Sequence, residues 1–578
     1  MRHDSAAMSS SSITPIARLA RYAHVIGGRR LRCVPVAWLV AIFGMALGAG
    51  LPVPGAAQPL AAALPSFAEL EALQARIGEV RVHTADVFDT QNPREDWTLY
   101  RWANALHIQT RASVVENALL FKRGDRVSAA VIEETERLLR GERYLYDVQI
   151  RPVAYQDGVV DIEVVTRDSW SIIPGLSAAR AGGENATGIR LREYNFLGTG
   201  TTLGIGHSSD VDRSSNQLLV SNDRVFGSRT AATLSLANNS DGERHEASVV
   251  RRFYSLDARW AAGATAVKDN RIDAVYNAGN VVSEYRHRQE QAEVFTGWSR
   301  GRVEGWVQRY SLGMSLLDDE FAPEPGLTAP SALNGDERLV GPFVRYELIE
   351  DRYAEVINRD MIGIPEFFPL GLASTLQLGW ASTGLGSSHD ALLYEGLVSR
   401  GFVPRPDHTL LASASISGQY TDGRVRKQLF GVEAKYYLPQ GRRWLFYAAA
   451  KGDLLTNPDV LDMLLLGGDN GLRGYPLRDQ AGDKSALLTL EERLYSNLFV
   501  WNLFRVGSAV FVDVGRAWGG PHVNAANPGW LADAGIGLRI SSVRVSTKDV
   551  LHIDLAFPLN ATSDIEKVQL LVKGKTSF

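Results

Sequence analysis

One arginine and two acids near the end of the chain have the types and spacing of a buried ionic cluster. Arg473 belongs to the segment Leu-Arg-Gly-Tyr at 472–475, and Glu491 and Asp513 follow on two later segments in which apolar and polar residues alternate. A guanidinium group removed from water needs carboxylate partners, because an unpaired buried charge is costly. Its planar fork can bind a carboxylate through two N–H groups at once. Glu491 and Asp513 are therefore candidate partners of Arg473.

The alternation around the two acids places both on the polar face of their segments. Their apolar neighbours fall on the opposite face: Leu488, Leu490, Leu494, Val510, Val512 and Val514. If these segments are strands, both acids point away from the apolar face. Gly474 and the glycines before it allow the tight path that the loop needs, and Tyr475 completes the motif. The alternative interpretation is that Arg473, Glu491 and Asp513 are ordinary pore-lining charges.

The elements that must position these residues form a long series of alternating segments. The series begins at Ile172 and runs to Phe578, and no stretch in it reads as a helix. It holds up to about 20 candidate strands, with weak patterns around residues 281–298 and 338–400. Trp, Tyr and Phe recur near the strand ends, as an interfacial girdle requires. These features predict a transmembrane antiparallel β-barrel over residues 168–578, whereas a soluble sandwich is the alternative fold.

Such a barrel closes by pairing its first and last strands, here residues 171–181 and 568–578. The last strand is a weak ladder partner, because Gly574 and several polar residues interrupt it. Its remaining residues of interest share one face: Val568, Leu570, Val572 and Phe578. A seam that opened sideways would expose edge groups that could template an incoming strand. Alternatively, the seam stays closed and Phe578 serves only as this protein's own assembly signal.

A small mixed domain is expected before the barrel, over residues 79–167. Residues 79–88 read as a strand, two helical segments follow, and Ser128 is the expected N-cap of the second. A turn at Asp157-Gly158 joins two further strands, whose inward apolar residues are Tyr146, Val148, Ile150, Val160, Ile162 and Val164. The order β-α-α-β-β gives a short sheet covered on one face by two helices, and residues 97–110 are long enough for an extra helix.

Residues 1–57 read as a signal peptide with an N-terminal extension. An apolar run at Val34–Leu51 follows three arginines and precedes small residues up to Ala57. A retained membrane anchor is the alternative, on the length of the run. Cys33 is the single cysteine and lies in this segment, so the mature chain would have no thiol for a disulfide, a metal site or a nucleophile. Export to an oxidising compartment fits this usage.

Composition and motif searches argue against several other classes of protein. The 578 residues carry a net charge of −4 and no basic block, which argues against nucleic acid as a partner. The 11 histidines show no HExxH spacing, and Gly206–Asp210 lacks the second glycine of a nucleophile elbow. We therefore expect no enzyme activity, no catalytic residues, no metal site and no cofactor.

From about residue 79 to its end, the chain resembles the BamA/TamA family of outer-membrane assembly barrels, also called the bacterial surface antigen type. The matching residues are Asn195–Gly198, Leu472–Tyr475, Glu491 with Arg493, and Asp513 with Gly515. Tyr475 stands where Phe is commoner, and the small domain resembles a polypeptide-transport-associated (POTRA) domain. The resemblance implies a barrel of about 16 strands. It also implies one extracellular loop that folds into the lumen and latches against the wall through Arg473, Glu491 and Asp513.

The resemblance implies a protein-handling machine in the outer membrane of a Gram-negative bacterium, with the N-terminal domain in the periplasm. Lipid of that membrane, unfolded or extended polypeptides, and periplasmic or lipoprotein subunits are the expected partners. Clients would add to the edge strand of the small domain and leave through the seam, unless the domain is only a spacer or folding aid. The alternatives are a two-partner secretion translocator and a passive pore or surface antigen of the same architecture.

Overall fold

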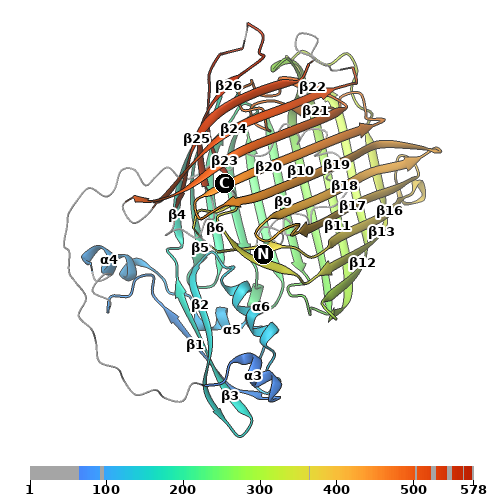
Figure 1. Cartoon of the computed structure of the whole chain (residues 1–578). Helices are drawn as coiled ribbons and strands as arrows, with labels where there is room; N and C mark the ends of the chain where they lie inside the picture. Colours follow the sequence, from blue (N-terminus) through green and yellow to red (C-terminus); the bar gives the residue numbers. More distant parts are fainter. Residues whose placement is uncertain are drawn as a thin grey trace.

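A small mixed domain leads into a large β-barrel, and the two parts stack end to end (Figure 1). The structure is a computed structural model that describes residues 64–91, 97–363, 365–500, 504–521, 529–542, 550–563 and 565–575. The predicted signal segment, residues 1–57, and the predicted terminal residue Phe578 lie outside the described residues. Within those ranges, no helix has the length and apolar character needed to cross a membrane.

The barrel comprises, within the described residues, 20 strands in one closed antiparallel sheet. Each strand pairs with its neighbour in sequence, except where short inward hairpins intervene, and β27 meets β4 to close the ring. The strands are β4 Ile172–Ala181, β5 Glu184–Phe196, β6 Thr201–Ser209, β7 Ser214–Asn222, β8 Ala231–Asn239, β9 Gly242–Arg251, β10 Trp260–Asn277, β11 Asn280–Val303, β12 Trp306–Pro323, β13 Glu337–Glu350, β16 Ala373–Ala381, β17 Ala391–Phe402, β18 Thr409–Thr421, β19 Arg424–Gln440, β20 Trp444–Thr456, β23 Lys484–Val500, β24 Phe504–Trp518, β25 Leu531–Ser542, β26 Val550–Pro558 and β27 Gln569–Lys575.

The predicted barrel is confirmed, and its strand number is the upper count that the alternation suggested. The smaller number implied by the family resemblance was wrong, because this chain supplies two additional hairpins to the closed sheet. Counting period-2 segments measures this chain directly, whereas the family number assumes that no hairpin has been added. The weakly patterned stretch 281–298 lies within one long strand, β11.

Side chains alternate between the outer and inner faces of the barrel wall. Large apolar side chains are exposed on the outer face of strands around the ring, among them Val294, Leu312, Val344, Leu376, Val432, Val510, Ile536 and Leu555. Polar side chains are buried on the inner face of the same wall, among them Gln291, Glu293, Ser311, Gln377, Ser417, Asp513 and Asp554. A closed sheet leaves no unpaired backbone edge, so an apolar exterior of this kind suits lipid.

Exposed aromatic side chains gather at both ends of the wall. At the end nearest the small domain they are Trp260, Trp306 and Trp444, which start strands or occupy turns there. At the opposite end, here called the far end, they are Trp380, Tyr420 and Trp530. Amphipathic rings prefer the level of the lipid headgroups, so the two groups fit the two faces of one bilayer.

The small domain is a three-stranded sheet in the order β1-β3-β2, with helices packed against it. Its elements are α3 Phe67–Ala72, β1 Arg76–Ala85, α4 Thr98–Leu106, α5 Ala112–Glu116, α6 Ala129–Leu139, β2 Leu145–Gln156 and β3 Val159–Asp168. One core joins helices and sheet through residues such as Leu70, Val115, Ile132, Leu139, Val148 and Ile162. The extra helix allowed for in residues 97–110 is α4, and α3 belongs to the same core although it precedes residue 79.

Two details of the small domain differ from the sequence predictions. Ser128 occupies the N-cap of α6, but its side chain makes no capping hydrogen bond. Tyr146 is exposed, and its predicted inward position was wrong, because the pairing register shifts between Leu145 and Asp147. Such a bulge turns the side chains before it to the opposite face.

The small domain is docked onto the turns at the near end of the barrel. Arg224, in the β7–β8 connection, forms an ion pair with Glu142 at 2.8 Å. Arg229, in the same connection, donates to the carbonyl oxygen of Ala118 at 3.0 Å. In α6, Glu134 accepts a hydrogen bond of 2.9 Å from the backbone N–H of Leu256, in the β9–β10 connection. Ionic and backbone hydrogen bonds therefore fix the domain on one side of the barrel mouth.

The buried carboxyl of Glu134 makes this docking sensitive to pH. Burial raises the pKa of Glu134 above its usual 4.5, against the lowering effects of the Leu256 N–H and of Arg137 and Arg302. The docked domain therefore favours the protonated acid, and docking weakens as pH rises through the raised pKa. We expect hydrogen exchange at the β9–β10 connection, corrected for intrinsic rates, to accelerate over that range. A Glu134→Gln variant should lose this dependence, and an unchanged dependence would contradict the assignment.

Candidate functional site

The connection between β20 and β23, residues 457–483, turns back into the barrel at its far end. We call this segment the inner loop. Its two short strands, β21 (Leu464–Leu466) and β22 (Gln480–Gly482), pair with each other (Figure 1). Leu464, Leu472 and Tyr475 are fully buried. The loop thus folds inward, as the family resemblance implied.

Arg473 lies at the centre of the inner loop and is buried against the barrel wall. Its Nε and Nη2 donate to the two carboxylate oxygens of Asp513, at 2.6 and 3.0 Å. Its Nη1 donates to Glu491 at 2.9 Å. The guanidinium also lies 3.4 Å from the ring centroid of Phe511, which supplies a cation–π contact. The structure therefore brings Arg473 together with both acids that the sequence analysis chose.

Further ionic residues that the sequence analysis did not choose extend this cluster. Asp554 on β26 lies 3.5 Å from Nη1 of Arg473 and forms an ion pair with Arg539 on β25. Arg493 on β23 donates to Glu491 at 2.9 Å. The residues concerned, Asp554, Arg539 and Arg493, all fall on the inner parity of their strands and are almost completely buried. That parity was the available signal, but it does not say which of many inward charges meet.

The cluster holds several full charges out of water, so each depends on the others. Thr489 donates a further hydrogen bond of 2.7 Å to Asp513, which leaves that carboxylate with three donated contacts. Removing one member of a buried ionic group leaves its partner uncompensated, at a cost of about 3–5 kcal/mol. These contacts therefore hold the inner loop against the barrel wall. In the part of the chain that the structure describes, no group of His, Cys, Asp and Glu side chains is arranged to hold a metal ion.

The two residues after Arg473 fit the wall so closely that their types are constrained. The backbone N–H of Gly474 donates to Asp533 at 2.9 Å. A Cβ at position 474 would lie 2.7 Å from the Cβ of Asp533, which no ordinary contact allows. The hydroxyl of Tyr475 donates to the carbonyl oxygen of Ala532 at 3.0 Å and lies 2.7 Å from Asn560. Phenylalanine at this position would lose both contacts.

A second ionic contact anchors the inner loop to the wall beyond the seam, at the β6–β7 turn. Arg478 donates two hydrogen bonds, each 2.7 Å long, to the carboxylate of Asp212 in the β6–β7 turn. The same guanidinium lies 4.3 Å from the ring centroid of Tyr276 on β10, whose hydroxyl lies 3.2 Å from Asp212. The sequence analysis missed this pair, because an aspartate in a turn and an arginine in a loop carry no mutual signal.

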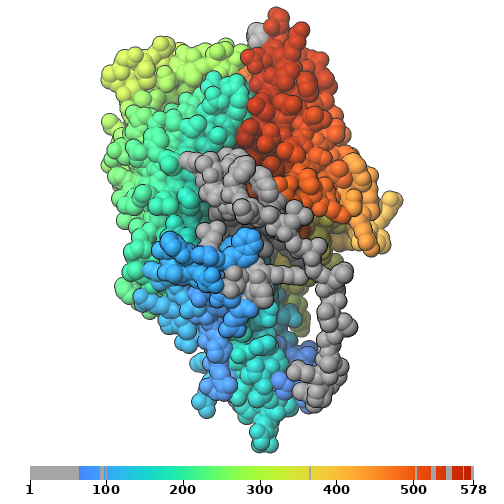
Figure 2. Space-filling view, turned by 90° about the vertical axis from the view of Figure 1, so that its left-hand side faces the viewer, coloured from blue at the N-terminus to red at the C-terminus, as the bar shows by residue number. Residues whose placement is uncertain are grey.

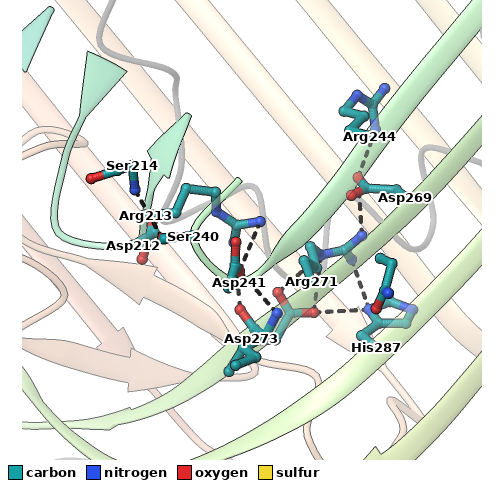
Figure 3. Close-up of polar contacts among 12 residues, drawn as sticks. Asp212, Arg213, Ser214, Ser240, Asp241, Arg244, Asp269, Arg271, Asp273 and His287 are labelled. Atoms are coloured by element: carbon teal, nitrogen blue, oxygen red, sulfur yellow. Dashed lines mark hydrogen bonds and ion pairs between the residues drawn. The ribbon is translucent and has the colours of Figure 1, made fainter. Parts of the chain in front are cut away.

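The turn that carries Asp212 is itself held by a polar network along neighbouring hairpins (Figure 3). Arg213 forms an ion pair of 3.3 Å with Asp241 in the β8–β9 turn. Asp241 also accepts a hydrogen bond of 2.9 Å from the backbone of β10. Deeper in the wall, Arg271 bonds Asp273 at 2.9 Å and His287 at 2.7 Å. The turn that binds Arg478 of the inner loop is therefore part of the rigid wall, and the contact is not an isolated surface pair.

A hairpin that the sequence analysis did not foresee enters the lumen from the near end. It connects β13 to β16 and contains β14 (Tyr353–Ile357) and β15 (Pro365–Pro369). Met361 and Ile362 at its tip are buried among inward side chains of the wall that include Tyr437, Tyr447 and Tyr495. Arg493 donates to the backbone oxygen of Arg359 in this hairpin at 3.0 Å. Because Arg493 also bonds Glu491, the hairpin and the inner loop share one ionic residue pair.

The seam between β27 and β4 has the least register pairing of the ring. Within the described residues its register consists of one pair, Val572 with Arg180, whereas β26 and β27 share seven pairs. Val568 and Leu570 are exposed on the outer face, as predicted from their spacing. Gly574 lies in β27 and is buried. Figure 2 shows the first strands and the last strands meeting above the small domain.

The inner loop contacts both strands of the seam from inside. Leu571 on β27, Ala181 on β4 and Leu477 in the loop belong to one buried apolar cluster. Lys573 on β27 donates to the backbone oxygen of Asp469 in the loop at 2.7 Å. Leu571 is an apolar residue among the polar inward-facing residues of β27, Gln569 and Lys573, and this cluster explains why it faces inward.

Comparisons with known proteins add little to this geometry. No model of a known protein family matches the chain, and no curated protein matches it. Among solved structures, BamA from Haemophilus ducreyi lacking POTRA domains 1–3 is 13% identical over 86% of this chain and 85% of its own, with a TM-score of 0.38. CdiB from Escherichia coli is 12% identical over 87% of this chain and 76% of its own, with a TM-score of 0.46.

The solved structures that match the chain also include an iron transporter. FrpB from Neisseria meningitidis is 9% identical over 75% of this chain and 79% of its own, with a TM-score of 0.37. Likenesses of this size carry no argument about function, because barrels with different tasks match about equally.

Replacing Arg473 by alanine should release the inner loop. The change leaves Asp513 and Glu491 buried without their cation, so local opening of residues 470–480 should become easier by about 3–5 kcal/mol. Opening of the loop in Arg473→Lys should be intermediate between that in the unsubstituted protein and that in Arg473→Ala. An ammonium group keeps the positive charge but cannot donate two parallel hydrogen bonds to Asp513. Hydrogen exchange and protease protection of the loop measure the effect. Arg424→Ala, an exposed arginine at the start of β19 and at the same end of the barrel, is the control. Protection of the loop that is unchanged in the Arg473→Ala variant would refute the fastening role.

The Arg478–Asp212 contact should make a separate contribution to the same loop. Hydrogen bonds to charged groups contribute about 1.5–3 kcal/mol, so Asp212→Asn should loosen residues 476–482 by part of that amount. A double-mutant cycle of Asp212→Asn with Arg478→Gln isolates the pair from other effects of each change. A coupling energy near zero, measured by hydrogen exchange, would show that the contact does not hold the loop.

Proposed function

We propose that this protein is an outer-membrane barrel of a Gram-negative bacterium that assists insertion, assembly or translocation of polypeptides. Its small domain would lie in the periplasm and receive extended clients, and the seam would be the place where client strands pass into the membrane. The proposal places the chain among BamA/TamA-like barrels on its motif residues. The closed barrel with an apolar exterior supports the membrane location.

The observation that carries the proposal is the joint contact of the inner loop with the ionic cluster and the seam. The loop is fastened at Arg473, and it touches β4 and β27 through Leu477 and Asp469. Among the residues that the structure describes, the seam it touches has a single register pair. A movement of the loop would therefore act on the β27–β4 junction, where the strands share the fewest pairs. Separation of these two strands would offer unpaired backbone groups to an incoming strand.

The small domain offers an entry point that suits extended polypeptides. Its sheet order leaves β2 at one outer edge, while the first half of β1 is bonded by residues 124–127. Pro152 lies within β2 and lacks an N–H, which limits how far another strand could extend along that edge. An extended client would pair with part of β2, with little dependence on its sequence.

A disulfide across the seam should stop the proposed activity. Val572→Cys with Arg180→Cys, in a Cys33→Ser background, joins the one register pair of the seam. The matched control joins Val572→Cys to Ile553→Cys across the ordinary β26–β27 junction. We expect cells with the oxidised seam pair to show the same loss of outer-membrane proteins as cells that lack the gene. Reductant should restore them, and the control pair should have no effect.

Two outcomes would turn the interpretation toward other functions. An outer-membrane proteome that does not change when the gene is removed would indicate a passive pore or surface antigen, as would a large, stable single-channel conductance. Loss of one secreted protein, with the membrane proteome intact, would indicate a two-partner secretion translocator. Full activity of the locked seam would exclude lateral opening while leaving transport through the lumen.

A further inference from the structure

Helix α4 of the small domain has two faces of different character. Its inner face is fixed to the chain before it: the ring of Tyr100 stacks on Phe88 with centroids 4.2 Å apart. The side chain of Asn104 accepts from the backbone N–H of Phe88 at 3.1 Å and donates to its carbonyl oxygen at 2.7 Å. The opposite face carries Trp102 and Leu106, one helical turn apart, which are 69% and 70% exposed. The helix is therefore ordered while it presents its apolar side outward.

The exposed apolar surface continues on both sides of the helix. Trp97 before it is 54% exposed, and Ile108 after it is 53% exposed. Arg101 is the only charged residue in α4, and no acid lies in it. By contrast, α6 of the same domain carries charged residues on its surface: Glu133, Glu136 and Arg137. Large apolar groups clustered on an otherwise polar domain mark a contact surface.

The position of α4 relative to the barrel is fixed by the segment that follows it. His107 lies 2.8 Å from the carboxylate of Asp168, the last residue of β3, and the backbone N–H of Thr110 donates to the same carboxylate at 2.7 Å. Thr110 also bonds Asn195, in the β5–β6 region, at 2.8 Å. Figure 1 shows α4 standing out sideways at the foot of β4 and β5. The helix therefore lies outside the wall, at the near rim and beneath the seam.

This location is continuous with the lipid-facing surface of the barrel. Ile172, four residues after Asp168, is already exposed on the outer face of β4. The near-end aromatic girdle of Trp260, Trp306 and Trp444 marks the level of the headgroups, and Trp102 of α4 and Trp97 before it suit the same level. A short helix with an apolar face, aromatic residues and no acidic charge binds a bilayer parallel to its surface.

We infer that α4 is a membrane-interface helix, which inserts Trp102 and Leu106 into the leaflet on the periplasmic side, next to the seam. The occupant of its exposed face is lipid, and neither another protein nor a segment of this chain. Such a contact would hold the small domain in one orientation below the seam and would disturb lipid packing where the sheet is weakest. The inference requires only that the barrel lie in a bilayer, so it stands or falls independently of polypeptide handling.

A fluorescent probe on the helix tests this directly. Leu106→Cys, in a Cys33→Ser background, is labelled with an environment-sensitive dye in the full-length protein and reconstituted into phosphatidylethanolamine–phosphatidylglycerol vesicles. We expect a blue shift of emission relative to detergent-free buffer standards, and loss of intensity when doxyl-labelled lipids are included. Quenchers placed in both leaflets make the result independent of insertion direction. Val159→Cys, an exposed site at the opposite end of β3 from Asp168, is the matched control and should remain unquenched.

Each other outcome overturns the inference. A probe at residue 106 that emits as in water and escapes lipid quenching, like the control, places α4 in solvent. A blue-shifted probe that doxyl lipids do not quench shows that protein covers the helix. Trp102→Ser should weaken the quenching at residue 106 while barrel heat-modifiability on gels is unchanged. Quenching that is equal with and without Trp102 would show that the apolar face does not make the contact.

Discussion

The buried guanidinium of Arg473 is the interaction on which the interior of this barrel depends. A cation in a lumen of this kind is stable only while Asp513 and Glu491 remain beside it, because its hydration has been replaced by those oxygens. Asp513 and Glu491 likewise remain stable as buried carboxylates only while Arg473 stays beside them. The charges of the cluster therefore depend on one another, because removal of any member would leave a buried charge without its partner.

The ionic cluster around Arg473 links parts of the protein that are far apart in the chain. Glu491 contacts the inner loop through Arg473 and the near-end hairpin through Arg493. The inner loop in turn contacts both seam strands and, through Arg478, the β6–β7 turn. Two segments that enter the lumen from opposite ends thus meet on one strand, β23. Arg493 and Glu491 thus form a continuous chain of contacts between the two segments.

The barrel and the small domain also depend on each other. Ionic and backbone hydrogen bonds hold the domain against turns on one side of the barrel mouth, so its edge strand and α4 keep a set position relative to the seam. A rigid docking of this type keeps the small domain on one side of the barrel mouth.

The sequence alone determined the barrel and the outward faces of its strands, because a period of two assigns each residue to one face of the sheet without any knowledge of its neighbours. The partners of Arg473 were predicted from the resemblance of its motif to a known family, because alternation alone does not select among the inward charges. Only the tertiary structure decided which inward charges meet. Asp212 and Arg478 are joined although they lie far apart in the sequence, and the β14–β15 hairpin turns inward to reach Arg493. The cause is closure of the sheet: it brings distant strands to face each other across the lumen, and local patterns carry no information about what lies opposite.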